Sequence, residues 1–369
     1  MLCREEETSV FWIDDDAQLA EVAPNWEDAI GLDTEFIRTD TFYPIAGLYQ
    51  VASGDSIYLL DPLHINDWTP FVRVLEDAQV TKVMHSCQED LELMAHHLRT
   101  RPTNLFDTQI ANAFVYPEYS LSYAKLVDRI CGVALEKQET RSNWLRRPLS
   151  DQQISYARGD VLYLVPMYRH LEAKLQDLGR GHWFDEEMRA RGVYREADPN
   201  NHYHLLKRAW TLKPRELARL QALCRWREQA ARELNVPRGR VVWDEHLLTF
   251  ACMHSLTVET LRASLPRHVA GEHGQALIAA HDQGSSAEAP QVPAKPLTSA
   301  QTAHLKAMRQ LASEQAASLG CAPELLSKRR DVEACLREFA NTGSLSAPFL
   351  GWRGELVGQG FMHILAERG

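Results

Sequence analysis

Two acidic residues stand one position apart at the end of a short apolar run. Asp33 and Glu35 follow Ala29–Leu32, a run that is typical of a buried strand. Alternate side chains of a strand project to the same face, so the two carboxylates are expected to point together. Burying them unpaired would be costly, and a hard divalent cation such as Mg²⁺ or Mn²⁺ would remove that cost because it prefers oxygen ligands. Acid pairs at exposed strand ends are common, so this pair alone is weak support for a metal site.

Two more acids and a tyrosine occur where they could join this pair. Glu89 and Asp90 open a predicted helix just after a short strand that ends at His85. Farther along the chain, Tyr156 and Asp160 are four residues apart in another predicted helix, so their side chains share one face. The spacing leaves open whether these groups converge in space.

The helix that carries Tyr156 and Asp160 is predicted to run from residue 150 to about residue 169. It begins at Ser150 and has Gln153 three residues later, which is the pattern of a capping box. Gly159 lies in its interior, where glycine costs up to about 1 kcal/mol relative to alanine. We therefore expect another group to pack closely against the backbone beside Asp160.

Convergence of four carboxylates and a tyrosine would suit phosphodiester hydrolysis by two metal ions. In that chemistry one ion activates a water and the other stabilises the leaving oxygen, with the ions about 3.5–4 Å apart. A tyrosine with a pKa near 10 is a poor base at neutral pH, but its hydroxyl can orient the water. The sequence has no H-E-x-x-H, P-loop, G-x-S-x-G or G-x-G-x-x-G motif, which disfavours zinc proteases, nucleotide hydrolases, α/β-hydrolases and dinucleotide oxidoreductases.

Composition indicates a globular protein of two or three domains. The chain has 369 residues, of which 45% are hydrophobic and 24% charged. Its longest apolar run, Val161–Tyr168, is far shorter than the about 20 residues of a membrane-spanning helix. The seven cysteines include no C-x-x-C pair, and the N-terminus lacks a signal-peptide pattern. We expect reduced thiols and a cytoplasmic location, without a membrane partner.

The net charge of −10 is unevenly distributed along the chain. Residues 1–200 carry about −15 and residues 201–369 about +5. Within Lys207–Arg240 there are ten basic and three acidic residues. This segment is either a surface that contacts nucleic-acid phosphates or a solvated, charge-rich helix face, and charge alone does not separate the two.

The first part of the chain alternates between predicted strands and helices, which indicates a mixed α/β domain over residues 1–205. The turn residues Ser53-Gly54-Asp55 predict a hairpin between two of the strands. The pattern becomes mostly helical from Glu89 onward. The predicted elements are strands over Leu48–Ala52, Ile57–Leu60 and Lys82–His85 and a helix over Trp68–Leu75.

Beyond residue 205 only helices are expected. A helical domain over 208–285, a linker over 286–296 and a second helical domain over 297–369 are predicted, because Gly284–Pro296 is rich in proline, alanine and serine. The last domain weakly repeats the first at an offset of 85 residues, as in the pairs Leu220/Leu305 and Leu234/Leu319. Alanine and leucine are common in helices, so chance could supply several of these matches.

The acidic segments resemble the three motifs of the DEDD exonuclease superfamily in its tyrosine-bearing subclass. The matching segments are Leu32-Asp33-Thr34-Glu35-Phe36, His85–Leu91 and Tyr156-x-x-x-Asp160, with Asn104–Gln109 between them. The segment Trp226–Pro237, followed by Asp244 and Leu247-Leu248, resembles an HRDC helical domain. Motif order and domain order together resemble the bacterial ribonuclease D family over nearly the whole chain.

This resemblance implies a fold and an activity. The fold would be an RNase H-like α/β exonuclease domain, a mixed sheet with flanking helices, followed by one or two all-α HRDC domains. The activity would be a 3′–5′ exoribonuclease that releases nucleoside 5′-monophosphates from tRNA precursors and other small structured RNAs. Asp33, Glu35, Asp90 and Asp160 would bind two divalent ions (Mg²⁺ or Mn²⁺), and Tyr156 would hold the attacking water. A monomer without a small-molecule cofactor is expected.

Several residues are candidates for RNA contacts. Phe36 could stack on the terminal nucleotide, although a phenylalanine beside a strand is more often part of a core. The arginines could contact phosphates, or could instead form structural ion pairs. Two rival functions stay open, a DNA 3′–5′ exonuclease of the same chemistry and a non-catalytic nucleic-acid-binding protein. The candidate arginines are Arg146, Arg147, Arg227, Arg238 and Arg240.

Overall fold

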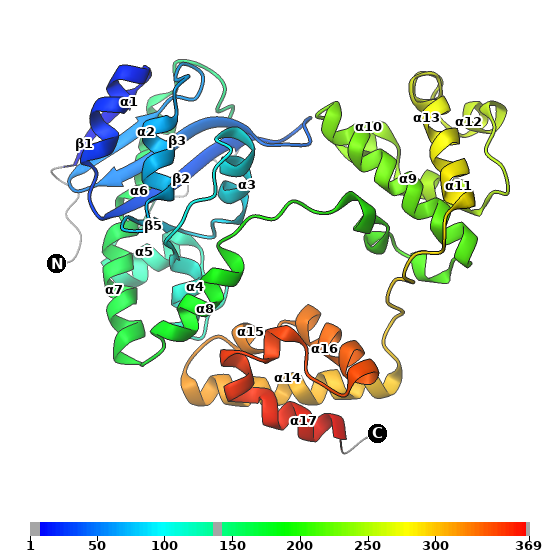
Figure 1. The fold of residues 1–369 in the computed structure, drawn as a ribbon. Helices are drawn as coiled ribbons and strands as arrows, with labels where there is room; N and C mark the ends of the chain where they lie inside the picture. Colours follow the sequence, from blue (N-terminus) through cyan, green and yellow to red (C-terminus); the bar gives the residue numbers. More distant parts are fainter. Residues whose placement is uncertain (1–7, 136–141, 367–369) are drawn as a thin grey trace. The chain divides into compact units, whose positions relative to one another are not determined.

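The computed structural model describes residues 8–135 and 142–366, which form two compact units (Figure 1). The sheet unit comprises the described residues up to Ile37, Ala46–Tyr194 and those from Leu297 onward. The helical unit comprises Arg38–Ile45 and Arg195–Pro296. Within the described part of the chain, no helix is both long enough and apolar enough to cross a membrane.

A six-stranded sheet with the order β1-β4-β3-β2-β5-β6 forms the centre of the sheet unit. β3 and β4 pair antiparallel, and Ser53 lies opposite Ser56, so the predicted hairpin is confirmed. Gly54 in its turn has a left-handed backbone conformation, at φ +55°. β1 pairs parallel with β4, and β2, β5 and β6 are parallel neighbours. The predicted mixed sheet is therefore confirmed. The strands are β1 Ser9–Ile13, β2 Ala29–Ile37, β3 Ile45–Ser53, β4 Ser56–Leu60, β5 Thr81–Met84 and β6 Leu105–Asp107.

Helices cover both faces of this sheet. Tyr49 and Val51 of β3 contribute to a core with α1, α2 and α3, whereas Leu48 and Ala52 of the same strand contribute to a core with α4 to α7. This alternation follows from the two-residue period of a strand. The predicted helix over Trp68–Leu75 corresponds to α2. The elements are α1 Asp16–Val22, η1 Ala23–Asn25, α2 Thr69–Glu76, α3 Gln88–His97, α4 Thr108–Val115, α5 Tyr123–Cys131, α6 Asp151–Leu162, α7 Leu164–Asp177 and α8 Gly181–Arg191.

The C-terminal helices share a core with the sheet unit. Trp352 is 2% exposed and its ring lies 5.0 Å from that of Phe114 in α4. The backbone N–H of Ala322 donates to the carbonyl of Ala113 at 2.8 Å, so the attachment includes main-chain hydrogen bonds. The C-terminal region is thus packed as part of the sheet unit. Its elements are α14 Ser299–Leu319, α15 Pro323–Leu326, α16 Arg329–Thr342, η4 Ala347–Phe349, η5 Gly354–Gly358 and α17 Gln359–Ala366.

The helical unit is built around the 20-residue helix α9, Pro214–Glu233. As predicted, no strand occurs past residue 205 among the residues that the structure describes. α13 continues to Ser286, so the first residues of Gly284–Pro296, predicted as linker, are helical. The remaining elements are η2 Pro199–Leu205, η3 Ala209–Thr211, α10 Arg238–Val241, α11 Asp244–Cys252, α12 Val258–Ser264 and α13 Arg267–Ser286.

Helix positions support the internal repeat. α14, α15 and α16 each begin 85 residues after α9, α10 and α11 respectively, which is the offset found in the sequence. The agreement ends there, because the first copy continues into the 20-residue helix α13, whereas the second ends in the short elements η4, η5 and α17. The two helical regions therefore share the spacing of their first three helices and differ after them.

Candidate active site

β2 carries the first two acids of the site. The strand continues through Asp33 and Glu35 to Ile37, farther than the apolar run alone indicated. Gly31 lies two residues before Asp33 on the same face, and a Cβ atom there would be 3.0 Å from the carbonyl oxygen of Val161. Glycine at this position therefore allows the end of α6 to pack directly on β2. This close packing brings the third acid, Asp160 of α6, beside the strand.

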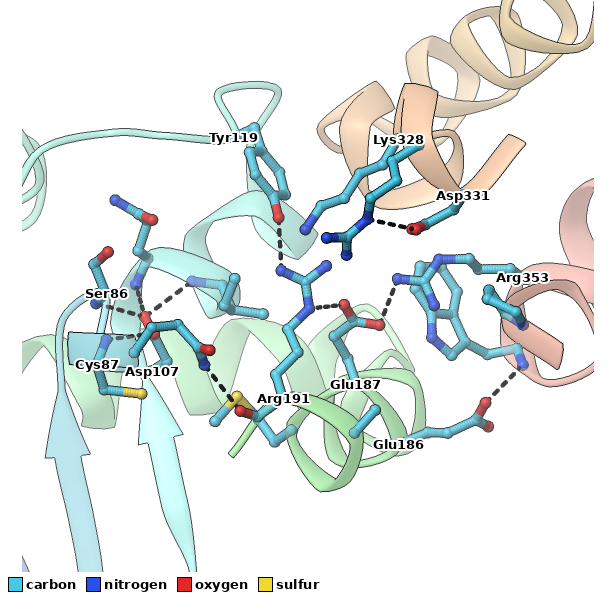
Figure 2. Close-up of a pocket in the computed structure, with 18 of the residues that line it drawn as sticks. Ser86, Cys87, Asp107, Tyr119, Glu186, Glu187, Arg191, Lys328, Asp331 and Arg353 are labelled. Atoms are coloured by element: carbon cyan, nitrogen blue, oxygen red, sulfur yellow. Dashed lines mark hydrogen bonds and ion pairs between the residues drawn. The ribbon is translucent and has the colours of Figure 1, made fainter. Parts of the chain in front are cut away.

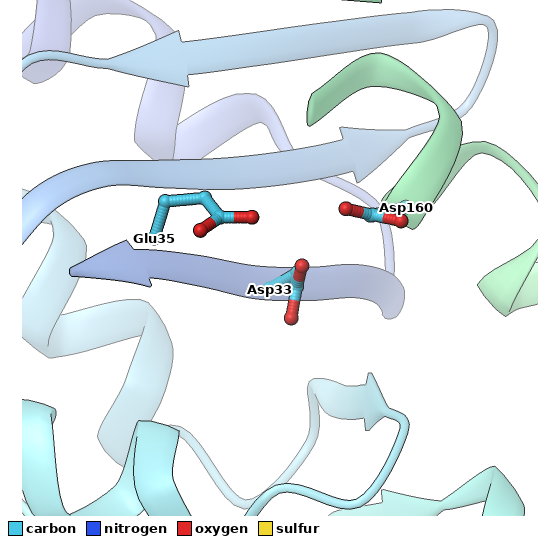
Figure 3. A group of neighbouring side chains, drawn as sticks. All are labelled: Asp33, Glu35 and Asp160. Atoms are coloured by element: carbon cyan, nitrogen blue, oxygen red, sulfur yellow. The ribbon is translucent and has the colours of Figure 1, made fainter. Parts of the chain in front are cut away.

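Asp33, Glu35 and Asp160 form one group of carboxylates (Figure 3). One oxygen from each lies within 4.8 Å of the others, so these three acids converge in space. The Oδ2 atom of Asp160 is buried and has no hydrogen-bond partner among the described residues. A buried, unpartnered carboxylate oxygen in an all-oxygen group fits a hard divalent cation such as Mg²⁺ or Mn²⁺.

Asp90 comes from α3, which packs on the other face of the sheet. Thr34 alternates with its acidic neighbours on β2, so its side chain points away from theirs, and its hydroxyl donates to Oδ1 of Asp90. Both Thr34 and Asp90 are buried. The strand segment Asp33-Thr34-Glu35 thus supplies two acids and positions a third. The strand period could have identified Thr34 as the residue that faces α3.

Asp107 supports the loop that leads into α3. Its carboxylate accepts hydrogen bonds from the backbone N–H groups of Ser86 and Cys87, at 3.1 and 3.2 Å. It also caps α4 by accepting from the N–H of Gln109 at 2.9 Å. One buried carboxylate therefore fixes both the start of α4 and the turn that places Asp90.

Burial raises the pKa values of all four acids, and repulsion from the other acids of the cluster adds to this for Asp33 and Glu35. Burial, with the charges of the other three acids, raises the pKa of Asp33 well above its usual range, and burial with the charge of Asp160 raises that of Glu35 to about 8. Burial also raises the pKa of Asp160 to about 7 and that of Asp90 to about 6, against hydrogen bonds that lower both. Without a cation, the cluster therefore retains protons near neutral pH.

Tyr156 lies one turn before Asp160 on α6, and the two side chains are hydrogen-bonded. Burial and the neighbouring carboxylates raise the pKa of Tyr156, so its hydroxyl stays protonated. The predicted capping box of Ser150 and Gln153 is confirmed. The predicted helix is divided, however, because α6 ends at Leu162 and α7 begins at Leu164.

The prediction about Gly159 holds only in part among the described residues, because a group does approach the backbone beside Asp160 but glycine is not needed to make room for it. A Cβ atom on Gly159 would have no neighbour within 4 Å, so nothing in the described structure requires glycine for close packing. What does approach this residue is a hydroxyl: Oη of Tyr123, in α5, donates to the Gly159 carbonyl at 2.8 Å. No sequence motif singled out Tyr123.

Two of the candidate RNA-binding residues in the sheet unit, Arg147 and Phe36, make contacts within the fold. All five N–H donors of Arg147 are used, in bonds to the Asp61 carboxylate and to backbone carbonyls, so its predicted contact with RNA is not supported. Phe36 is half-buried and packs against the core formed with α1 to α3. Arg146, by contrast, is exposed.

Burial also removes Arg227 from the predicted RNA contacts of the helical unit. Its side chain is 1% exposed and pairs with Asp244 at 2.6 Å, which leaves no surface to meet a phosphate. Arg238 is partly exposed and paired with the buried Glu228. Arg240 is 68% exposed, in an ion pair with the equally exposed Asp40. Trp243, which belongs to none of the sequence motifs, is 67% exposed.

A cavity of about 590 Å³ lies between α8 and the C-terminal helices (Figure 2). None of the four acids lines it. Its ionic groups pair with one another, since Glu187 accepts from both Arg191 and Arg353 and the hydroxyl of Tyr119 accepts from Arg191 at 2.6 Å. The cavity is therefore separate from the acidic cluster, and the acidic side chain of Glu187 in its lining is paired with arginines of the same lining.

Comparisons with known proteins agree with this geometry. Residues 10–176 match the 3′–5′ exonuclease family and residues 216–280 match the HRDC domain. Ribonuclease D of Pseudomonas paraeruginosa is 38% identical over 367 residues, covering 96% of this chain and 97% of that protein. Ribonuclease D of Escherichia coli is 33% identical over 352 residues, covering 92% and 93%.

A solved structure is similar over nearly the whole chain. The crystal structure of Escherichia coli RNase D, described as an exoribonuclease involved in structured RNA processing, superposes with a TM-score of 0.89 at 32% identity. The match covers 96% of this chain and 98% of that one. Both the sheet with its flanking helices and the helical C-terminal region are therefore shared.

Proposed function

The chain belongs to the ribonuclease D family of 3′–5′ exoribonucleases, and we propose that it trims the 3′ ends of tRNA precursors and other small structured RNAs by two-metal hydrolysis. The products would be nucleoside 5′-monophosphates. The observation that carries the proposal is the group of Asp33, Glu35 and Asp160, whose carboxylate oxygens lie within 4.8 Å of one another. The structured-RNA role of the Escherichia coli enzyme supports this class of substrate.

Four acids would hold the metal ions. Asp33, Glu35 and Asp160 would supply one group of oxygens, and Asp90 would add a carboxylate from α3. Bound divalent cations would lower the pKa of a water and neutralise charge on the leaving oxygen. Binding would also relieve the repulsion that raises the pKa values of these acids. The all-oxygen donor set favours Mg²⁺ or Mn²⁺ over zinc.

Tyr156 would hold the attacking water. Its hydroxyl is hydrogen-bonded to Asp160 and stays protonated, so it can orient a water but cannot remove its proton. Its ring lies 6.1 Å from that of Trp144, which restricts the orientation of the phenol. The tyrosine therefore acts by position rather than as a base.

Exposed cationic and aromatic side chains would contact the RNA. Arg146 of the sheet unit and Arg240 of the helical unit are exposed and suited to phosphate contacts. Trp243 offers an exposed ring on which a base can stack. We retain Phe36 and Arg238 as weaker candidates, because each is already partly packed or paired. The protein is proposed to work as a cytoplasmic monomer without a small-molecule cofactor.

The decisive experiment uses a 5′-labelled, unstructured RNA with purified full-length protein and Mg²⁺ or Mn²⁺. We expect a ladder that shortens from the 3′ end and releases 5′-monophosphates, and that EDTA and Asp33→Asn abolish. Asp151→Asn is the matched control, since Asp151 is exposed at the start of α6 and should leave activity unchanged. A matched DNA oligonucleotide tests the DNA-exonuclease alternative. Protein that binds RNA but shortens neither strand would support the binding-only alternative.

A further inference from the structure

The two helices α6 and α7 are separated at a single residue, Tyr163, three positions after Asp160. In a continuous α-helix the N–H of Tyr163 would donate to the carbonyl of Gly159. Here the N–H of Tyr163 instead meets the carbonyl of Val161 and a hydroxyl group from another helix. The hydrogen bond that is missing at this break is therefore the one that the carbonyl of Gly159, next to Asp160, would accept.

The hydroxyl belongs to Tyr123, in α5. Its Oη atom donates to the Gly159 carbonyl at 2.8 Å and accepts from the N–H of Tyr163 at 3.4 Å. The hydroxyl is thus inserted between the two groups that would otherwise bond to each other within the helix. Insertion of a side chain into the helical hydrogen-bond ladder is a recognised cause of a local break.

Pro166 does not account for this particular missing bond. A proline has no N–H, so Pro166 removes the bond to the carbonyl of Leu162, one turn later than the bond at Tyr163. The next bond of the ladder, from the N–H of Met167 to the carbonyl of Tyr163, is present at 3.0 Å. Pro166 and Tyr123 therefore act on different hydrogen bonds.

The environment of Tyr123 keeps its hydroxyl in place as a donor. The side chain is half-buried overall, and its ring makes an edge contact with His85 at 5.7 Å. Burial of the hydroxyl, with the charges of Asp160 and Asp33, raises the pKa of Tyr123, so the group stays protonated. His85 is itself held by Thr108 at 2.9 Å, which connects this contact to the start of α4.

We infer that Tyr123 is a positioning residue for the acidic cluster: its inserted hydroxyl fixes the Gly159 carbonyl and so sets Asp160 against Asp33 and Glu35. Gly159 has no side chain of its own to restrain this peptide, and no described neighbour lies within 4 Å of where its Cβ atom would be. The orientation of Asp160 therefore depends on the hydroxyl from α5. This inference rests on the proposed function, in which Asp160 binds a metal ion.

The test compares Tyr123→Phe with Tyr203→Phe in the full-length protein. Tyr203 is a matched control because its buried hydroxyl also donates to a backbone carbonyl, that of Gln291, at 2.8 Å, but in the helical unit. For each protein, Mn²⁺ affinity is measured by calorimetry in the absence of RNA, and kcat and KM are measured on a short unstructured RNA at saturating Mn²⁺. Thermal unfolding is recorded for both variants.

For Tyr123→Phe we expect Mn²⁺ affinity to fall about threefold to tenfold and kcat to fall by a similar factor, with KM for RNA unchanged, because one hydrogen bond that positions a ligand is lost. Tyr203→Phe should change neither quantity, although both variants lose some thermal stability. Equal Mn²⁺ affinities in the two variants would overturn the inference and leave Tyr123 a structural role only. A wild-type protein that binds no Mn²⁺ would overturn the proposed function as well.

A crystal structure of Tyr123→Phe keeps the inference testable even if the variant is unstable in solution. We expect the N–H of Tyr163 to donate directly to the Gly159 carbonyl and the Asp160 carboxylate to move relative to Asp33. An unchanged Asp160, with the break at Tyr163 preserved, would overturn the inference.

Discussion

Arg147 donates to both carboxylate oxygens of Asp61, from Nε at 2.8 Å and from Nη2 at 2.5 Å. Asp61 is 1% exposed, and although burial alone would raise its pKa, the hydrogen bonds from Arg147 and its neighbours hold that pKa below its usual value. The remaining donors of Arg147 reach the carbonyls of Gly47, Trp144 and Arg146. The pair thus ties the segment before α6 to the sheet.

We predict that Arg147→Ala lowers the free energy of unfolding by about 3 kcal/mol, because the buried carboxylate of Asp61 loses its arginine partner and keeps only its hydrogen bonds with Leu63 and His64. Denaturant unfolding measures this change. Arg146→Ala is the neighbouring control and should stay within about 0.5 kcal/mol of wild type, since its side chain is exposed. A wild-type stability for Arg147→Ala would contradict the structural role.

The acidic cluster predicts an unusual pH dependence for the metal-free protein. The pKa values of Asp90, Asp160 and Glu35 are raised to about 6, 7 and 8, so these three acids bind more protons in the folded state than in the unfolded state above about pH 4. Above about pH 7, where the histidines with lowered pKa values no longer titrate, stability in EDTA should therefore fall as the pH rises to about 8. Melting temperatures measured across this range test the sign, and a flat or rising profile would contradict it.

Two aspartates on α6 provide the matched variants for this prediction. Asp160→Asn removes an ionisable group from the cluster, so it should raise the melting temperature in EDTA at pH 8 and flatten the pH profile. Asp151→Asn changes an exposed residue on the same helix and should leave the profile unchanged. Mn²⁺ at a free concentration 100 times its Kd should stabilise the wild-type protein at pH 8 by about 2.7 kcal/mol. The same concentration should have little effect on the stability of Asp160→Asn.

Glycine replacements test the packing that places Asp160. Gly159→Ala should raise stability by up to about 1 kcal/mol, because alanine favours the helix and its Cβ atom would meet no described atom within 4 Å. Gly31→Ala should lower stability by about 1–3 kcal/mol, because its Cβ atom would lie 3.0 Å from the carbonyl of Val161 and push α6 from β2. Mn²⁺ affinity should fall in Gly31→Ala only. Equal affinities in the two variants would contradict this account.

Local patterns predicted much of the fold and the acids of the site. Strand alternation put Asp33 and Glu35 on one face, and the capping box located the start of α6 at Ser150. These features depend on residues close together in the sequence, so local sequence patterns are enough to predict them. The 85-residue offset of the helical repeat is likewise a property of the chain itself, and the starts of three helices follow it.

Contacts between distant segments could not be predicted in the same way. Arg147 and Arg227 were candidates for phosphate contacts because they are cationic, but each is held by a distant acid, Asp61 or Asp244, that the sequence does not pair with it. The insertion of the Tyr123 hydroxyl beside Gly159 joins residues 36 positions apart. Charge and periodicity show which groups are present, whereas the tertiary structure determines which of them are already satisfied.

The surface of the helical unit gives a prediction about RNA affinity that separates exposed from buried side chains. Arg240→Ala should weaken RNA binding, because the surface ion pair of Arg240 with Asp40 is weak enough to exchange for a phosphate. The slope of the logarithm of the RNA association constant against the logarithm of the salt concentration should decrease in magnitude by about 0.7–0.9, as expected for one lost phosphate contact. Trp243→Ala should weaken binding by about 1–3 kcal/mol through loss of stacking, with an unchanged salt slope. Fluorescence anisotropy with a labelled RNA in EDTA measures both quantities without cleavage.

Arg227→Ala is the contrasting variant for these two surface residues. It should lower the stability of the helical unit, because Arg227 is buried against Asp244, and should leave the salt slope of RNA binding by the folded protein unchanged. A wild-type affinity and slope in Arg240→Ala, together with a wild-type affinity in Trp243→Ala, would exclude this surface from RNA binding.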